Sequence, residues 1–376
     1  MLRHPERWGR LRPRYEAERP RRMLSLDGGG IRGLITLGYL ERIEELVGRP
    51  LCEFFDYIAG TSTGAIIAAC LAQGMTVAGI IDFYERDGQT MFDKSSWLDW
   101  WRHTYESGPL TEKLKSTFGP RRTLAPDDLR TLLLVVTHNR TTQSLWPVSS
   151  NPDAKYNDPS HPRCNLRTPL WQLVRASTAA PTYFPPELIP FDPADPTRRF
   201  TFVDGGVTVH NNPAFLLFRM ATDAAYRLEW KTGEHNLLLV SVGTGFAPVA
   251  GPGGNEPWKL ANAIEVLETV MNSAILDQDI NCRFIGRCTY GPVIDREVGD
   301  MVSLDPPDKD TGRAFLYVRY NVDLTPDSLR DLGLFDIDAA RVRGMDAVDQ
   351  ITNLLRIGRS AAARQVRAGH FGSFAG

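Results

Sequence analysis

Short apolar runs separated by glycine turns mark the first part of the chain. Residues 23–26 form an apolar run, which predicts a buried strand. Apolar side chains then recur at three- and four-residue spacing over residues 34–46, and this period predicts an amphipathic helix. Residues 54–59 predict a second strand, and residues 65–72 predict a small, tightly packed buried helix. This succession of strand, glycine turn and helix is typical of a parallel sheet with crossover helices.

The remainder of the chain continues the α/β pattern. Residues 348–355 place apolar side chains on one face of a predicted helix, and residues 144–148 are compatible with a short edge strand. Four further apolar runs predict strands: residues 132–136, 200–203, 237–242 and 315–320. We therefore expect an α/β protein with a central, mainly parallel sheet.

Length and composition restrict the class of protein. The 376 residues suit two domains, or one large α/β domain with extensions. Hydrophobic residues make up 42% of the chain, charged residues make up 23%, and the net charge is −2. These values exclude a mainly disordered or collagen-like chain and give no drive toward nucleic acid. The five cysteines are scattered and form no CxxC pair, so we expect a reducing cytoplasm and no structural zinc.

The first 22 residues form a basic arm. They contain eight arginines and three glutamates, and no apolar block that would mark a secretory signal. No later stretch approaches the uninterrupted apolar length of a membrane span. Two interpretations of the arm stay open: a solvated or docked tail, or a segment that weakly contacts anionic lipid headgroups.

The second glycine turn has the pattern of a nucleophile elbow. Residues 60–64 read Gly-Thr-Ser-Thr-Gly, a G-x-S-x-G placed between a strand and a helix. Gly60 and Gly64 leave room for a sharp turn that holds Ser62 in a strained conformation with its hydroxyl exposed. In a simpler alternative, Ser62 only caps the helix that follows.

The first glycine turn fits an oxyanion hole better than a nucleotide site. Gly28, Gly30 and Gly33 satisfy G-x-G-x-x-G, but the second strand ends in the serine turn instead of the acidic residue that a dinucleotide site needs. A P-loop is excluded because no Gly-Lys-Ser/Thr follows. A serine nucleophile requires donors for the developing oxyanion, and the successive N–H groups of Gly28, Gly29 and Gly30 at a helix N-terminus can supply them.

A serine nucleophile also needs a base, and the chain offers two candidates. His210 is the histidine that merits a test, since the other later histidines lie in unpatterned polar surroundings. Asp204 closes an apolar strand and opens a glycine turn, which would place it at the same sheet edge as Ser62. A partly shielded carboxylate within hydrogen-bond reach can act as a base. In the structural alternative, Asp204 only forms a turn before Gly205.

Four segments together resemble the patatin-like phospholipases. Residues 26–33 read LDGGGIRG and residues 55–64 read FDYIAGTSTG, followed by ASTAAPTYF at residues 176–184 and VDGG at residues 203–206. Their order and spacing also match, so the resemblance covers roughly residues 23–245. The combination is similar to the plant storage lipases and to the calcium-independent phospholipases A of bacteria and animals.

The resemblance implies a patatin fold, in which a central, mainly parallel sheet is flanked by helices in a three-layer α/β/α arrangement. It implies a Ser/Asp dyad without a catalytic histidine, with Ser62 as nucleophile and Asp204 as base, and it implies no metal or cofactor. The glycine loop would form the oxyanion hole, where Arg32 matches the family's basic position. Members of this family hydrolyse acyl esters of glycerolipids, and some transfer the acyl group to other acceptors.

These observations predict a cytoplasmic lipid acyl hydrolase of the phospholipase A type that visits membrane surfaces. We expect the basic arm (residues 1–22), a catalytic domain (residues 23–325) and a helical C-terminal extension (residues 326–376). Two alternatives stay open. One is a phospholipase effector of antiphage defence that a small-molecule nucleotide signal activates, and the other is a catalytically silent lipid-binding scaffold.

Three tryptophans add a hypothesis about the lipid. Trp97, Trp100 and Trp101 lie beside a basic residue, a combination that suits a membrane interface. They would form a lid or docking patch for lipid, or alternatively belong to a core helix that covers the sheet.

Overall fold

The computed structural model describes residues 2–92, 108–161, 164–181, 184–190, 195, 197–247, 261–295, 299–300 and 312–375, with the backbone alone at residues 261–267. Trp97, Trp100 and Trp101 lie outside the described residues. In the described part of the chain, no helix combines the length and the apolar composition that crossing a membrane would require.

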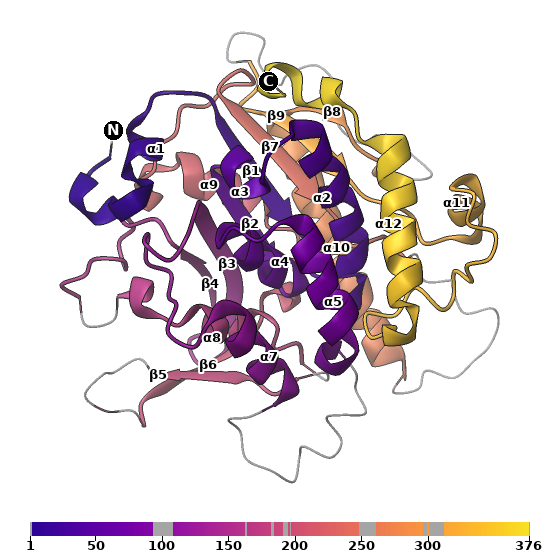
Figure 1. Cartoon of the computed structure of the whole chain (residues 1–376), viewed down its shortest axis with the longest axis horizontal. Coiled ribbons are helices and arrows are strands. Elements are labelled where there is room, and N and C mark those ends of the chain that lie inside the picture. Colours follow the sequence, from indigo (N-terminus) through magenta and orange to yellow (C-terminus); the bar gives the residue numbers. More distant parts are fainter. Residues whose placement is uncertain are drawn as a thin grey trace.

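Within these residues nine strands form one sheet in the order β5-β6-β3-β2-β1-β7-β9-β8, with β4 paired to β3 (Figure 1). The six strands from β3 to β8 in this order pair in parallel, whereas β4, β5 and β6 join by antiparallel pairing at one side. The strands are β1 (Arg21–Leu26), β2 (Tyr57–Thr61), β3 (Leu132–Asn139), β4 (Ser144–Ser149), β5 (Glu187–Pro190), β6 (Arg199–Asp204), β7 (Leu237–Val242), β8 (Arg287–Tyr290) and β9 (Leu316–Tyr320). The expected mainly parallel sheet is confirmed.

Helices cover both faces of this sheet. The helices are α1 (Arg12–Glu16), α2 (Gly33–Val47), α3 (Leu51–Phe54), α4 (Thr63–Ala72), α5 (Val77–Phe92), α7 (Pro109–Phe118), α8 (Leu170–Ser177), α9 (Ala214–Thr222), α10 (Ala261–Ile285), α11 (Pro326–Asp331) and α12 (Ile351–Gln365). Alternate residues of β1 enter separate cores: Leu24 and Leu26 pack with α2, α4 and α12, and Met23 packs with α9 and the N-terminal arm. Two cores on opposite faces of one sheet confirm the three-layer arrangement.

The C-terminal segment lies along α2. Helices α2 and α12 run side by side (Figure 1) and cross where Gly38 faces Gly358. A Cβ atom on Gly38 would lie 2.5 Å from the Gly358 carbonyl carbon, so the two backbones touch without side chains between them. This close contact holds the loop before α12 next to the glycine turn after β1, because α2 begins at that turn.

The N-terminal arm is docked on the opposite face. Trp8, Leu11 and Tyr15 are buried in the core that includes α9. Asp56, which is fully buried, forms ion pairs with Arg14 and Arg19. The basic charge of the arm is therefore partly neutralised within the fold, which favours the docked-tail interpretation.

The second predicted strand begins later than expected. Residues 51–54 form the helical turn α3, and β2 starts at Tyr57. The Pro50 carbonyl oxygen accepts hydrogen bonds from the N–H groups of Glu53 and Phe54. The first apolar residues of this stretch therefore form a helical turn, and the strand begins after it. A short apolar run does not distinguish these two structures.

Candidate active site

Strand register brings Ser62 and Asp204 together. Thr61 at the end of β2 pairs with Val136 of β3, and the next residue of β3, Thr137, pairs with Asp204. The sequence suggested Asp204 at the carboxyl edge of a parallel strand, but β6 runs antiparallel to β3. Asp204 still reaches this edge. Strand β3 extends beyond the end of β2, and β6 pairs with that extension and ends there at Asp204.

Ser62 occupies a strained turn between β2 and α4. Its backbone angles, φ of 56° and ψ of −123°, lie in a region that residues other than glycine rarely adopt. A Cβ atom on Gly60 would lie 2.1 Å from the Gly64 carbonyl oxygen, and one on Gly64 would lie 2.3 Å from the Leu26 carbonyl oxygen. Both glycines are therefore required for the turn that was expected from the G-x-S-x-G spacing.

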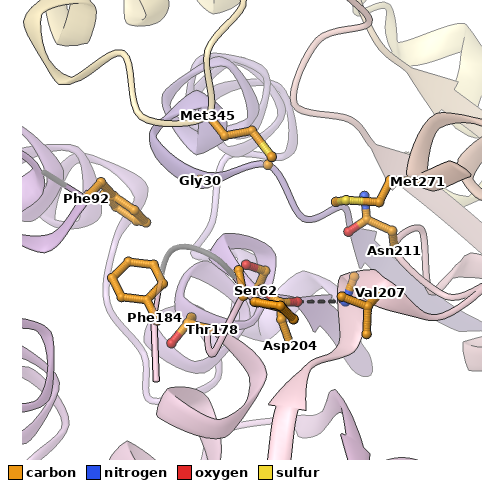
Figure 2. Close-up of a pocket in the computed structure, with 14 residues that line it drawn as sticks. Gly30, Ser62, Phe92, Thr178, Phe184, Asp204, Val207, Asn211, Met271 and Met345 are labelled. Atoms are coloured by element: carbon orange, nitrogen blue, oxygen red, sulfur yellow. Dashed lines mark hydrogen bonds between the residues drawn. The ribbon is translucent and has the colours of Figure 1, made fainter. Parts of the chain in front are cut away.

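The Ser62 hydroxyl lies beside the Asp204 carboxylate, where as a hydrogen-bond donor it lowers the pKa of that carboxyl. Asp204 is 3% exposed, and its Oδ1 also accepts the Gly206 N–H at 2.7 Å (Figure 2). Burial raises the pKa of Asp204 from 3.8 to about 6, although the hydrogen bonds from Ser62 and Gly206 act in the opposite direction. The carboxylate is thus mainly ionised at neutral pH and close to the proton of the serine.

Ser177 supports the elbow from beneath. Its Oγ accepts the Ser62 N–H at 2.9 Å and donates to the Val136 carbonyl oxygen at 2.7 Å. The same segment holds the aspartate, because the Asp204 N–H donates to the Ala179 carbonyl oxygen at 2.9 Å. The sequence contained this segment as a family motif but gave no role to its serine.

The glycine loop presents fewer free donors than expected. The Gly28 N–H donates to the Asn211 carbonyl oxygen at 3.1 Å, and the Ile31 N–H donates to the Met345 carbonyl oxygen at 2.9 Å. Within the described residues, the N–H groups of Gly29 and Gly30 have no acceptor. Both glycines line the same pocket as Ser62, so their N–H groups are available for the predicted oxyanion hole, whereas that of Gly28 is engaged.

Arg32 contacts a different part of the molecule. Its Nη1 donates to the carbonyl oxygen of Arg343 at 3.1 Å, and it is not among the described residues that line the pocket. The side chain therefore fastens the glycine loop to the segment before α12. The contact described here gives Arg32 a positioning role, and its place in the oxyanion hole stays a prediction.

His210 is separate from the Ser62–Asp204 pair. Its side chain is 8% exposed and interacts with Gln278, and burial lowers its pKa. The backbone carbonyl of His210 accepts the Thr61 hydroxyl at 2.8 Å, but the residue is not among those described as lining the pocket. Asn211, the next residue, does line it.

A narrow, mostly apolar pocket surrounds the serine (Figure 2). It has a volume of about 50 Å³, and its apolar wall includes Phe92, Phe184, Val207, Met271 and Met345. These five come from distant parts of the chain. Phe184 ends one of the four family segments, but sequence analysis gave none of the five a role in a pocket. Among the described residues, no group of three or more His, Cys, Asp or Glu side chains is placed to hold a metal ion.

The fold and the site define an α/β protein with a serine at a nucleophile elbow beside a buried aspartate. The family model for patatin-like phospholipases matches residues 24–218, more than half of the chain. The chain therefore belongs to the patatin-like phospholipase family, as the four sequence segments suggested.

Curated proteins of animals, plants and bacteria are similar to the chain. The 85/88 kDa calcium-independent phospholipase A2 of Rattus norvegicus is 31% identical over 270 residues, covering 64% of this chain and 30% of the rat protein. Patatin-15 of Solanum tuberosum is 28% identical over 306 residues, 70% of this chain and 72% of the potato protein. The cGAMP-activated phospholipase of Vibrio cholerae is 31% identical over 238 residues, 56% of this chain and 62% of that protein. The chain spans less than a third of the length of the rat relative.

Proposed function

We propose that the chain hydrolyses acyl esters of phospholipids or related glycerolipids, with Ser62 as nucleophile and Asp204 as base. The observation that carries this proposal is the contact between the Ser62 hydroxyl and a buried carboxylate whose pKa is about 6. The free N–H groups of Gly29 and Gly30 border the same pocket, where they can receive a negatively charged oxygen.

The geometry supports a two-step reaction. Asp204 accepts the Ser62 proton as Oγ bonds to the ester carbonyl carbon, and the carbonyl oxygen becomes an oxyanion held by the N–H groups of Gly29 and Gly30. The bond to the alcohol then breaks, and the alcohol leaves with the proton from Asp204. Water next gives a proton to Asp204 and adds to the acyl carbon, and Ser62 regains its proton as the fatty acid leaves.

The substrate class follows from the pocket and from the relatives. An apolar wall suits acyl chains, and the relatives from rat and Vibrio cholerae are named as phospholipases. A membrane or lipid aggregate would present this substrate, so we infer transient contact with a membrane surface. A cytoplasmic location stays a prediction from the sequence.

Hydrolysis of phosphatidylcholine vesicles and of p-nitrophenyl butyrate in the presence of EDTA tests the proposal. Wild type, Ser62→Ala, Asp204→Asn and His210→Ala are compared, with circular dichroism as the control for folding. We expect wild type and His210→Ala to hydrolyse both substrates without a metal ion, and the other two variants to lose activity by about a thousandfold or more. Loss of activity in folded His210→Ala, or full activity in Ser62→Ala, would contradict the proposed dyad.

A second candidate function is a phospholipase that a nucleotide signal activates. The similarity to the cGAMP-activated phospholipase favours it. Adding cyclic dinucleotides to the vesicle assay separates the two candidates, since a constitutive hydrolase keeps the same rate and an activated one gains its rate only with nucleotide.

A further inference from the structure

The C-terminal part of the chain contributes to the pocket around Ser62. Met345, in the loop before α12, lines this pocket, although it lies more than 100 residues beyond the segment 24–218 that the family model matches. Its carbonyl oxygen accepts the Ile31 N–H at 2.9 Å. A Cβ atom on Gly30 would lie 2.1 Å from this same oxygen, so the loop rests directly on the glycine turn.

Met271 of α10 lines the pocket beside Met345 and also lies beyond the matched segment. A Cβ atom on Gly206 would lie 3.4 Å from Met271 Cε, which places this side chain over the turn that follows Asp204. Figure 2 shows Met345 and Met271 extending over the glycine loop and Asn211, with Met345 across the pocket from Asp204 and Ser62 between them.

The proposed reaction determines which part of an ester lies near Met345. The alcohol leaves with a proton from Asp204, so its oxygen must face that carboxylate. The carbonyl oxygen faces the N–H groups of Gly29 and Gly30. The acyl chain then leaves the carbonyl carbon on the side away from Asp204. In Figure 2 Met345 lies beyond Ser62 as seen from Asp204, next to Gly30, so an acyl chain that passes the glycine loop would meet it.

The small volume of the pocket makes the Met345 side chain important for the length of the acyl chain that the site accepts. The space of about 50 Å³ beside Ser62 holds only a few water molecules, so the side chains that line it restrict which acyl chains can lie there. Methionine is unbranched and flexible, and it adapts to apolar partners of different shape. Met345 is half-buried, and its contact with Ile31 uses the backbone, so its side chain can be replaced without removing that contact.

We propose that Met345 is a specificity-determining residue that contacts the acyl chain of the substrate and limits the chain length that the site accepts. This inference rests on the proposed hydrolase function. Met271 forms the neighbouring part of the same wall.

Esters of p-nitrophenol with butyrate, octanoate and laurate test the inference at a constant alcohol. Met345→Ala should raise the laurate-to-butyrate ratio of kcat/KM by about tenfold, because one substrate methylene accepted or rejected by an apolar pocket is worth roughly 10- to 200-fold in discrimination. Met345→Trp should lower the ratio by a similar factor. Met75→Ala is the matched control, since Met75 lies half-buried between α4 and α5, packs against the core and is not among the described residues that line the pocket.

A second series keeps the acyl group as butyrate and varies the alcohol. The inference predicts that Met345 variants change the acyl series and leave the alcohol series within about twofold of wild type. Unchanged ratios in the acyl series, or equal changes in both series, would overturn it while the hydrolase function stands. Absence of Ser62-dependent hydrolysis in wild type would instead reject the proposed function, and this inference with it.

Discussion

The carboxylate of Asp27 and the guanidinium of Arg319 form a bidentate ion pair directly beneath the glycine loop. Nη1 of Arg319 lies 3.0 Å from Oδ1 of Asp27, and Nη2 lies 2.6 Å from Oδ2. Each residue is only 1% exposed, and Arg319 Nη1 also donates to the Ser241 hydroxyl at 2.7 Å. The pair joins the ends of β1, β7 and β9 and fixes the residue before Gly28.

Removing one member of this pair should be more harmful than removing both. Arg319→Met leaves a buried, uncompensated carboxylate and should lower the free energy of unfolding by about 3–5 kcal/mol. Combining it with Asp27→Asn removes the buried charge, and the double variant should recover most of that loss. Urea unfolding of the two single variants and the double variant measures this coupling. Additive effects of the two substitutions would show that the pair contributes no coupling.

The raised pKa of Asp204 predicts a specific pH dependence of the rate. The carboxylate must be ionised to accept the Ser62 proton, so activity is retained above its pKa of about 6 and lost as the pH falls through it. We expect kcat/KM to fall about tenfold per pH unit on the acid side. The ester p-nitrophenyl butyrate serves as substrate, with product measured at one fixed pH. An acid limb near the ordinary pKa of 3.8, or a limb that shifts in His210→Ala, would contradict this assignment.

The burial of Asp204 also predicts that its ionised carboxylate lowers the stability of the fold. Because the folded-state pKa of Asp204 is raised, the favourable contribution of its protonated form is complete below about pH 4 and is lost as the pH rises through about 6. A shift from 3.8 to about 6 corresponds to roughly 3 kcal/mol as an upper limit. Asp204→Asn should therefore raise the free energy of unfolding by about 1–3 kcal/mol at about pH 8 and by much less at about pH 4.

Guanidinium unfolding at the two pH values measures this gain. Asp195→Asn is a suitable control, since Asp195 is only half-buried and its pKa is lowered mainly by a hydrogen bond from the Thr197 side chain. The interpretation fails if Asp204→Asn destabilises the protein at the higher pH, because the carboxylate would then contribute more through its hydrogen bonds than burial takes away.

The local features of the site were predictable from sequence, and the long-range contacts were not. The G-x-S-x-G spacing around Ser62 is a local pattern, and the Gly60 constraint arises within the turn from the Gly64 carbonyl oxygen, so the elbow and its strand could be predicted. The antiparallel direction of β6 depends on pairing with β3, which no local pattern encodes. Arg319 lies in a run that predicts a buried strand, and its partner Asp27 is almost 300 residues away.

The residues around the pocket also depend on long-range contacts that the sequence could not predict. The Gly28 N–H donates to the Asn211 carbonyl oxygen, a contact that only the tertiary structure provides. Local sequence could therefore not show that this one of the three predicted oxyanion donors is already engaged. Met271 and Met345 occur in segments without a recognisable motif, and they reach the pocket through the packing of α10 and α12. Patterns therefore predicted the reacting groups but not the wall that would contact the substrate.

Gly64 of the elbow predicts a strong steric effect. A Cβ atom on Gly64 would lie 2.3 Å from the Leu26 carbonyl oxygen and 2.7 Å from that of Asp27. These are backbone atoms of the strand that leads into the glycine loop, so they cannot move without displacing Gly29 and Gly30. Gly64→Ala should lower the free energy of unfolding by about 1–3 kcal/mol. It should also reduce kcat by a larger factor than the factor by which it changes KM.

Gly79→Ala provides the matched control in α5, where the nearest atom to an added Cβ is Thr76 Oγ1 at 3.4 Å. Alanine there should leave activity unchanged and keep or raise stability by up to about 1 kcal/mol, because glycine is the poorer helix former. Thermal unfolding and kcat, measured on both variants, test whether Gly64 is required for the turn. If Gly64→Ala matches wild type in both, the elbow has room that the backbone distances do not show. If it loses kcat at unchanged stability, the turn positions the reacting groups without adding to the stability of the fold.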